Sequence, residues 1–143
     1  MTLQVGVKVL LRNPEGKVLL LLRSAKYETA EGTWDIPGGR IDADAPLRES
    51  LDREIREETK LALSGEPVLV GAQDIFFTNS KGEEMHIVRL TYVGTASGEP
   101  VLDGEEHTEY KWVAFSELSG ISNLDPYFKK LLSDKVLTED SWN

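Results

Sequence analysis

The chain has 143 residues, of which 40% are hydrophobic and 29% are charged, and its net charge is −9. This length favours a single domain over residues 1–143, and the composition excludes a disordered chain and a collagen-like repeat. The lack of cysteine excludes disulfides, thiolate nucleophiles and Cys-ligated zinc, and the excess of acidic residues disfavours stable nucleic-acid binding, which needs Lys and Arg against the phosphates.

The first segment predicts a β-hairpin. Residues 4–11 alternate valine with small or polar residues, as a strand does. Residues 13–16 read Asn-Pro-Glu-Gly, which suits a type I turn, and residues 17–23 return as a second, more buried strand. The aliphatic run 18–22 is the longest in the chain and is far too short to cross a membrane. Because the N-terminus also lacks the pattern of a signal peptide, we expect a cytoplasmic protein that does not bind membranes.

A helix follows a short extended segment at residues 34–36. Asp44 or Ala45 can serve as its N-cap, with a proline tolerated in the first turn, and it runs to about residue 59 or 60. One apolar stripe along this helix is formed by Leu47, Leu51 and Ile55.

The second half of the chain predicts further strands and two more helices. The extended segments are residues 68–77, 85–93 and 110–115, with a turn at 80–82 between the first two. A helix begins near Ser116, and an amphipathic helix covers residues 125–135. This order of elements predicts a mixed α/β domain with helices packed on a sheet.

Three carboxylates gather on one side of the first predicted helix. Glu54, Glu57 and Glu58 are spaced i, i+3 and i+4, so they project from one face, where like charges repel. Oxygen ligands without Cys or His suit a hard divalent cation such as Mg²⁺ or Mn²⁺. The alternative is a solvated acidic face with surface ion pairs, in which Arg53 pairs with Glu49 and Glu57 at i±4.

The residues around this helix resemble the Nudix box, a loop-helix signature that runs Gly, five residues, Glu, seven residues, Arg-Glu-apolar-x-Glu-Glu-x-Gly-apolar. Gly39 opens it here, and residues 53–61, Arg-Glu-Ile-Arg-Glu-Glu-Thr-Lys-Leu, close it at matching spacing. The lead-in at 34–39, the strand ending in Arg23 and the segment 110–118 also match the family, so the resemblance spans nearly the whole chain. It implies the Nudix fold, an α/β (α+β) domain with a mixed β-sheet sandwiched between α-helices.

The chain departs from the box at two positions. The first Glu of the box is Ala45 here, and its late Gly is Lys60. In the family that Glu mainly supports the box arginine, so we expect Glu49 or Asp44 to hold Arg53 instead. Lys60 either ends the helix without a left-handed residue or adopts that conformation itself at some cost.

The resemblance implies Mg²⁺-dependent hydrolysis of a pyrophosphate bond in a nucleoside diphosphate linked to another moiety, with Mn²⁺ as a substitute. The implied metal ligands are Gly38, through its carbonyl, Glu54, Glu57 and Glu58. The implied catalytic residues are Glu57, Glu54 and Arg53, joined by Glu106 as the first candidate from the acidic loop 103–107. The general base stays open between a helix glutamate and Glu106.

The substrate partner is expected to be a small nucleotide or nucleoside diphosphate derivative. Arg23 and Arg40 are the basic residues best placed for its phosphates, although each also suits a plain surface role. Candidates for base stacking, all equally suited to a core, are Tyr27, Phe76, Phe77 and Trp34. His86 and His107 form no HExxH-type pair and are interpreted as ordinary strand or loop residues. Many relatives are dimers, so a homodimer is compatible with the resemblance.

The substrate itself stays open within the family. Residues 76–79 carry neither the Pro of the ADP-sugar hydrolases nor the Tyr of the dinucleoside polyphosphate hydrolases, which favours a nucleoside triphosphate or a related small triphosphate. An ADP-sugar or dinucleotide pyrophosphatase is one alternative. A non-catalytic Nudix-fold nucleotide-binding module is another, favoured by the two departures and disfavoured by the three retained acids. An isopentenyl-diphosphate isomerase is disfavoured because its cysteine is missing.

Overall fold

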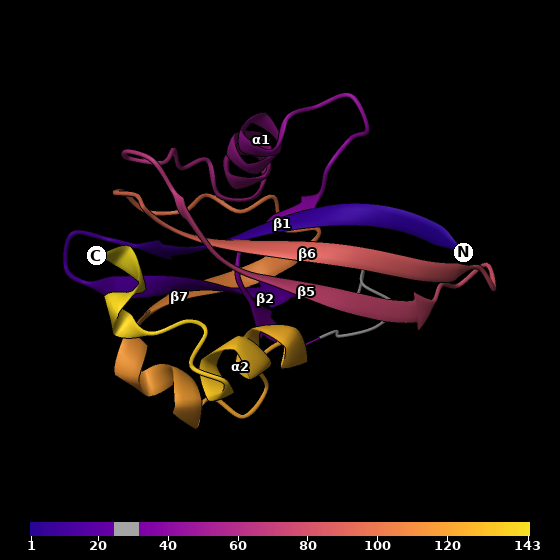
Figure 1. Ribbon diagram of the computed structural model, residues 1–143. Helices are drawn as coiled ribbons and strands as arrows, with labels where there is room; N and C mark the ends of the chain where they lie inside the picture. The colour runs from indigo at the N-terminus through magenta and orange to yellow at the C-terminus, as the bar shows by residue number, and fades with distance from the viewer. Residues whose placement is uncertain (25–31) are drawn as a thin grey trace.

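The computed structural model describes residues 1–24 and 32–143, so Tyr27 lies outside the described residues. The strands are β1 (Thr2–Arg12), β2 (Lys17–Arg23), β3 (Trp34–Asp35), β4 (Gly38–Arg40), β5 (Val68–Thr78), β6 (Glu84–Thr95) and β7 (His107–Ala114). The helices are α1 (Leu47–Thr59), the 3₁₀ helix η1 (Phe115–Gly120), α2 (Pro126–Ser133) and the 3₁₀ helix η2 (Glu139–Trp142). Helices α1 and α2 lie on opposite faces of the sheet (Figure 1), which confirms the predicted sandwich.

The sheet is mixed and runs in the order β3-β2-β1-β6-β5, with β4 added to β1 and β7 added to β2. Strands β1 and β6 are parallel, and the other pairs are antiparallel. The predicted hairpin is correct only at its turn, because β1 and β2 pair at Arg12 and Val18 and then take different partners. Strands β3 and β4 join the sheet beside the point where β1 and β2 diverge, and the glycine lead-in enters there.

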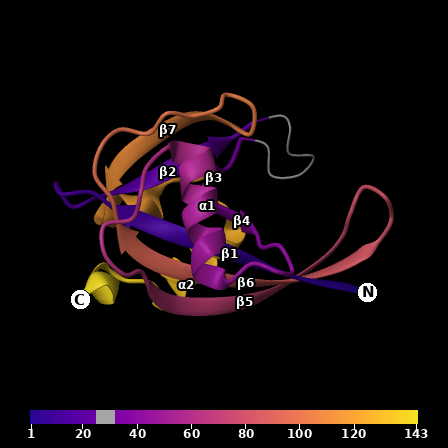
Figure 2. The same cartoon turned by 90° about the horizontal axis from the view of Figure 1, so that it is seen from above.

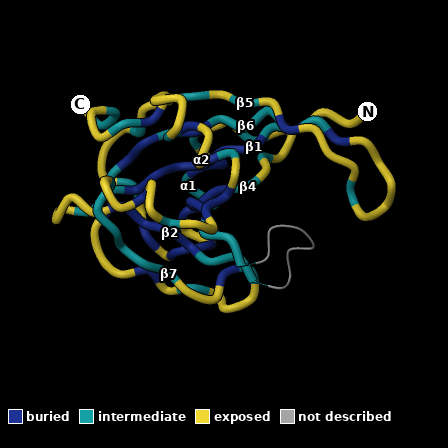
Figure 3. Tube along the Cα trace, turned by 90° about the horizontal axis from the view of Figure 1, so that it is seen from below, coloured by how far each residue is buried: buried dark blue, intermediate teal, exposed yellow. Residues whose placement is uncertain are grey.

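Alternate residues of β1 face two different cores. Val7 packs with Leu51 and Ile55 of α1, and Leu10 packs with Phe128 of α2 on the opposite face. Helix α1 crosses over the sheet in the view of Figure 2, and it contacts β1 and β4. Burial is concentrated between these layers, whereas the edge strand β5 is largely exposed (Figure 3).

The N-terminus of helix α1 differs from the prediction, whereas its C-terminus matches one of the two predicted alternatives. Its N-cap is Pro46, which makes no side-chain cap bond, rather than Asp44 or Ala45. Lys60 adopts the left-handed conformation, with φ of 63°, and its N–H donates to the carbonyl of Arg56. The helix therefore closes without the glycine that this backbone conformation favours.

The C-terminal elements agree with the predicted order, with shifted boundaries. The strand expected at 110–115 begins at His107, and the helix expected near Ser116 is the short 3₁₀ helix η1. Asp125 caps α2 by accepting from the backbone N–H groups of Tyr127 and Phe128. Among the described residues, no helix has the length and apolar character needed to cross a membrane.

Candidate metal and phosphate site

The glycine lead-in lies tightly against β1. Gly38 has φ of 145°, and a Cβ atom there would lie 2.0 Å from the carbonyl oxygen of Val7 and 2.7 Å from Cα of Lys8. No larger residue fits without moving the backbone, which explains why the chain needs glycine here. The consequence is that β4 presents its backbone at a fixed place in front of α1.

Two helix carboxylates meet this glycine strand. Glu58 Oε1 accepts a hydrogen bond of 2.7 Å from the backbone N–H of Gly38. A Cβ atom at Gly39 would lie 2.7 Å from the carboxylate of Glu54, so the lack of a side chain there makes room for that group. The structure thus places the carboxylates of Glu54 and Glu58 beside Gly38 and Gly39.

Glu57 completes the acidic face from the solvent side. Its residue is exposed on α1, and it belongs to no ion pair with Arg53 among the described residues, contrary to the surface-pair alternative. Burial raises the pKa of the Glu54 carboxyl, and the charges of Glu57 and Glu106 raise it further, against the opposing charges of Arg53 and Lys8. Burial is the largest of these causes, so the raised pKa of Glu54 reflects its removal from water more than repulsion from Glu57 and Glu106.

A second acidic group reaches the site from the loop before β7. Ligand atoms of Glu58, Glu106 and His107 all lie within 4.8 Å of one another. Glu106 was expected here, whereas His107 was not. The signal for His107 was its place directly after Glu106 in an acidic loop, but its burial, with 3% of its surface exposed, depends on the tertiary fold.

Glu58 and His107 face each other without forming an ion pair. Glu58 Oε2 lies 3.5 Å from His107 Nδ1. Burial raises the pKa of Glu58 to about 8, and burial together with the charge of Lys8 lowers the pKa of His107 to about 4. Both groups are therefore neutral at pH 7, and a protonated carboxyl faces a neutral imidazole.

This donor set fits a divalent metal ion. Carboxylate oxygens suit Mg²⁺ and Mn²⁺, and a neutral imidazole is also a good ligand for Mn²⁺. A cation bound here would displace the proton of Glu58 and would offset the repulsion among Glu54, Glu57 and Glu106. The site thus has the chemistry to hold a metal.

Arg53 stands beside this face and contacts two polypeptide segments. Its Nη1 donates to Asp42 Oδ2 over 2.8 Å, and its Nη2 donates to Glu54 Oε1 over 3.2 Å. A longer bond of 3.4 Å joins Nη2 to the carbonyl of Arg40. The guanidinium therefore links the loop after β4 to a carboxylate of the site.

The prediction that Glu49 or Asp44 holds Arg53 is wrong. Among the described residues, no ion pair joins Arg53 to Glu49 or Asp44, and Asp42 holds it instead. The physical reason is the loop at 42–45, which turns back on itself before α1 begins and brings Asp42 beside the helix.

Arg23 belongs to an internal ion-pair network. Its Nη2 bonds to Asp35 and its Nη1 lies 3.2 Å from Asp125 Oδ1, and only 11% of its side chain is exposed. Asp35 also accepts from Lys8 Nζ at 3.0 Å, and Arg89 Nη1 lies 3.0 Å from Asp125 Oδ2. A phosphate at Arg23 would have to compete with these carboxylates.

The other predicted substrate residues lie apart from one another. Arg40 is exposed at the end of β4, with its guanidinium 5.7 Å from the ring centroid of Phe77. Phe76 points to the opposite face of the sheet, where its ring stacks on His86 at 4.3 Å. The geometry therefore pairs Arg40 with Phe77 rather than with Phe76.

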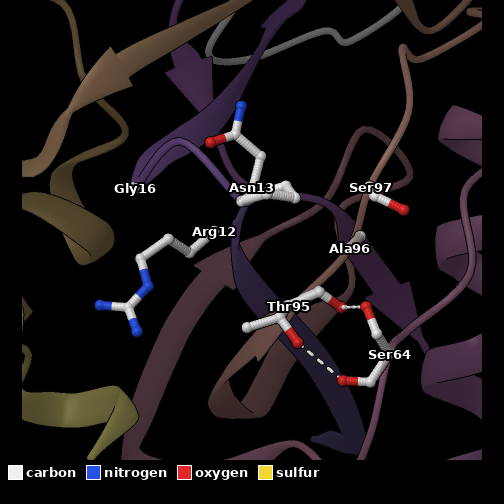
Figure 4. A pocket seen from close by; sticks show the side chains of 8 residues that line it. Arg12, Asn13, Gly16, Ser64, Thr95, Ala96 and Ser97 are labelled. Carbon is white, nitrogen blue, oxygen red and sulfur yellow. Dashed lines mark hydrogen bonds between the residues drawn. The ribbon is translucent and has the colours of Figure 1, made fainter.

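A separate hollow of about 460 Å³ lies at the far end of the sheet (Figure 4). It is lined by the turn after Arg12 and by residues near Thr95, and Thr95 and Ser64 bond to each other there. None of the residues predicted for the site lines it, so its position is unrelated to the carboxylate cluster.

Comparison with known proteins identifies a matching family and several similar proteins. Residues 2–134 match the NUDIX domain family. Nucleoside triphosphatase NudI of Escherichia coli O17:K52:H18 (strain UMN026 / ExPEC) is 28% identical over 109 residues, covering 73% of this chain and 77% of that protein. The crystal structure of the MutT protein from Methanosarcina mazei Go1 superposes with a TM-score of 0.80 at 30% identity, covering 92% of this chain and 91% of that one.

A further relative matches a shorter stretch. The m7GpppN-mRNA hydrolase NUDT17 of Danio rerio is 38% identical over 64 residues, covering 45% of this chain, and this chain spans only 21% of that protein. These likenesses to hydrolases support a pyrophosphohydrolase, and the match over residues 2–134 shows that the chain belongs to the Nudix family.

Proposed function

We propose that this chain is a Mg²⁺-dependent pyrophosphohydrolase of nucleoside triphosphates or related small triphosphates. The observation that carries the proposal is the approach of Glu54 and Glu58 to the glycines of β4, with Glu106 and His107 close to Glu58. The name of the relative NudI, a nucleoside triphosphatase, supports the choice of substrate.

The helix carboxylates would hold the metal. Glu54, Glu57 and Glu58, with the Gly38 carbonyl, form the proposed ligand set, and Mn²⁺ would substitute. When bound, the ion neutralises charge on the pyrophosphate and lowers the pKa of a water molecule. Hydrolysis would form a bond from the water oxygen to phosphorus and break a bridging P–O bond. The nucleoside monophosphate or the pyrophosphate would leave with the bridging oxygen, and the proton of the water would pass to the general base.

Glu106 is the proposed general base. A carboxylate oxygen of Glu106 lies within 4.8 Å of one of Glu58, so Glu106 would accept the proton of a water bound beside the proposed ligands. A helix glutamate remains the alternative base. Arg53 would keep Glu54 in place, and Arg40 is the exposed cation available to the phosphates.

The competing functions separate in one assay. The purified chain is incubated with the common ribo- and deoxynucleoside triphosphates, an ADP-sugar and a dinucleoside polyphosphate, with Mg²⁺ or with EDTA, and products are separated by ion-exchange chromatography. We expect Mg²⁺-dependent cleavage of one or more triphosphates to a monophosphate and pyrophosphate. Binding without cleavage of any compound would favour the nucleotide-binding module, and full activity in EDTA would contradict the metal-dependent mechanism. The cytoplasmic location, the single domain and the homodimer stay predictions.

A further inference from the structure

Helix α1 borders a surface hollow of about 410 Å³ beside Ala45, where the Nudix box carries its first glutamate. Its walls include Asp42, Ala45, Ser50, Arg53 and Arg56. Two buried polar atoms in this wall, Ser50 Oγ and Arg53 Nε, have no hydrogen-bond partner among the described residues. Both atoms can donate a hydrogen bond, so a carboxylate placed in the hollow could accept from them.

The shortest contact of the guanidinium next to this hollow is with Asp42. Asp42 binds Nη1 at 2.8 Å, whereas the contacts of Nη2 with Glu54 and with the Arg40 carbonyl are longer, at 3.2 Å and 3.4 Å. We propose that Asp42 is a positioning residue, which holds Arg53 so that the Glu54 carboxylate stays against Gly39. This inference rests on the proposed function, because Glu54 is a proposed metal ligand.

Asp42 should affect the position of Arg53 more than the stability of the fold. The Asp42 side chain is 66% exposed, and exposed ion pairs contribute little to folding. Loss of Asp42 would leave Arg53 with its two longer contacts and would free its long, flexible side chain to turn toward solvent. Glu54 would then lose a partner that fixes its orientation, which affects the metal more than the fold.

A substitution in the hollow should restore the function that is lost when Asp42 is removed. A glutamate at position 45 would place its carboxylate among the unpaired Ser50 Oγ and Arg53 Nε, so Ala45→Glu would hold Arg53 from the other side. It would add little to the natural protein, in which Asp42 is present. It would restore function when Asp42 is removed, and this dependence on background is a double-mutant cycle.

The test compares the natural chain, Asp42→Ala, Asp42→Asn, Ala45→Glu and the Asp42→Ala/Ala45→Glu pair. Asp44→Ala is the matched control, an exposed carboxylate two residues along the same loop. Each protein is measured for kcat and KM at saturating Mg²⁺, for Mn²⁺ affinity by electron paramagnetic resonance, and for Tm. We expect both Asp42 variants to lose about tenfold in kcat and about tenfold in Mn²⁺ affinity. KM should change less than about twofold and Tm by less than about 2 °C, and Ala45→Glu should restore both losses.

Two results would overturn the assignment. One is a kcat and Mn²⁺ affinity in both Asp42 variants that match the control. The other is a loss that Ala45→Glu does not restore, which would mean that Asp42 acts by another route than Arg53. If the natural chain cleaves no nucleotide, the proposed function fails, and the Mn²⁺ affinities still decide the role of Asp42.

Discussion

Two groups of buried carboxylates lie near Lys8, and their pKa values shift in opposite directions. In the first, burial pushes the pKa of Asp35 upward, but the charges of Lys8, Arg23 and Arg89 outweigh burial and hold it at about 2. In the second, burial raises the pKa of Glu58 to about 8, because Lys8 and the Gly38 N–H do not offset it.

The difference separates a structural ion-pair network from the proposed metal site. Asp35 has its counter-charges within the protein, at 3.0 Å from Lys8 Nζ and in contact with Arg23, so it needs no ligand. Glu58 faces Glu106 and a neutral His107, so its ionised form needs a cation from outside. The lack of compensation at Glu58 therefore supports its proposed role as a metal ligand.

The largest expected effect comes from breaking the balanced group. Asp35→Asn would leave Lys8 and Arg23 buried beside a neutral amide, and we expect a loss of about 3–5 kcal/mol in the free energy of unfolding. Urea denaturation measures it. Asp74→Asn is the control, because Asp74 Oδ1 lies 2.7 Å from His86 Nε2 while the Asp74 side chain is 65% exposed, and the substitution should cost less than about 1 kcal/mol. Equal losses in the two variants would contradict the contrast between compensated and exposed pairs.

The next effect concerns the uncompensated group. Glu57→Gln and Glu58→Gln should each lower kcat by about a hundredfold, equivalent to about 2.7 kcal/mol, because each removes a proposed metal ligand. Circular dichroism should show an unchanged fold. Glu49→Gln, an exposed glutamate on the same helix, is the control. Rates close to natural in both ligand variants would refute the proposed metal site.

A smaller effect is the pH dependence of stability without metal. Folding raises the pKa of Glu58 from 4.5 to about 8, so its contribution to stability is complete below the unfolded pKa and is lost as the pH rises through about 8. His107 acts in the opposite sense, since its pKa falls from 6.5 to about 4 and its contribution is lost only as the pH drops through about 4.

Between about pH 6.5 and about pH 8.5 the slope therefore belongs to Glu58, at up to about 1.4 kcal/mol per pH unit. Urea denaturation in EDTA should show the natural chain losing stability with rising pH and Glu58→Gln losing much less. Parallel pH profiles of the two proteins would show that Glu58 is not the titrating group.

The strands, helix α1 and part of the candidate site could be predicted from local sequence. Alternating and helical periodicities locate the strands and α1, and the i, i+3, i+4 spacing places Glu54 and Glu58 on one face because helix geometry is local. The glycines before α1 likewise predict a close approach of the backbone, and Gly38 does lie tightly against Val7.

The sequence did not predict the contacts that form between different segments of the chain. Arg53 binds Asp42 because a loop turns back, and Arg23 binds Asp125, which is 102 residues away. The burial of His107 depends on how the loop before β7 packs against α1. Spacing along one element carries no information about such contacts, because tertiary packing sets them.

The most direct test of the central claim is a calorimetric titration of Mn²⁺ into the natural chain and into Glu58→Gln at pH 7, in two buffers of different ionisation enthalpy. If Glu58 is an uncompensated carboxyl that is protonated until a cation binds, the natural chain releases about one proton per metal ion, and Glu58→Gln releases far less and binds more weakly. Binding without proton release in the natural chain, or equal release in the two proteins, would contradict the account.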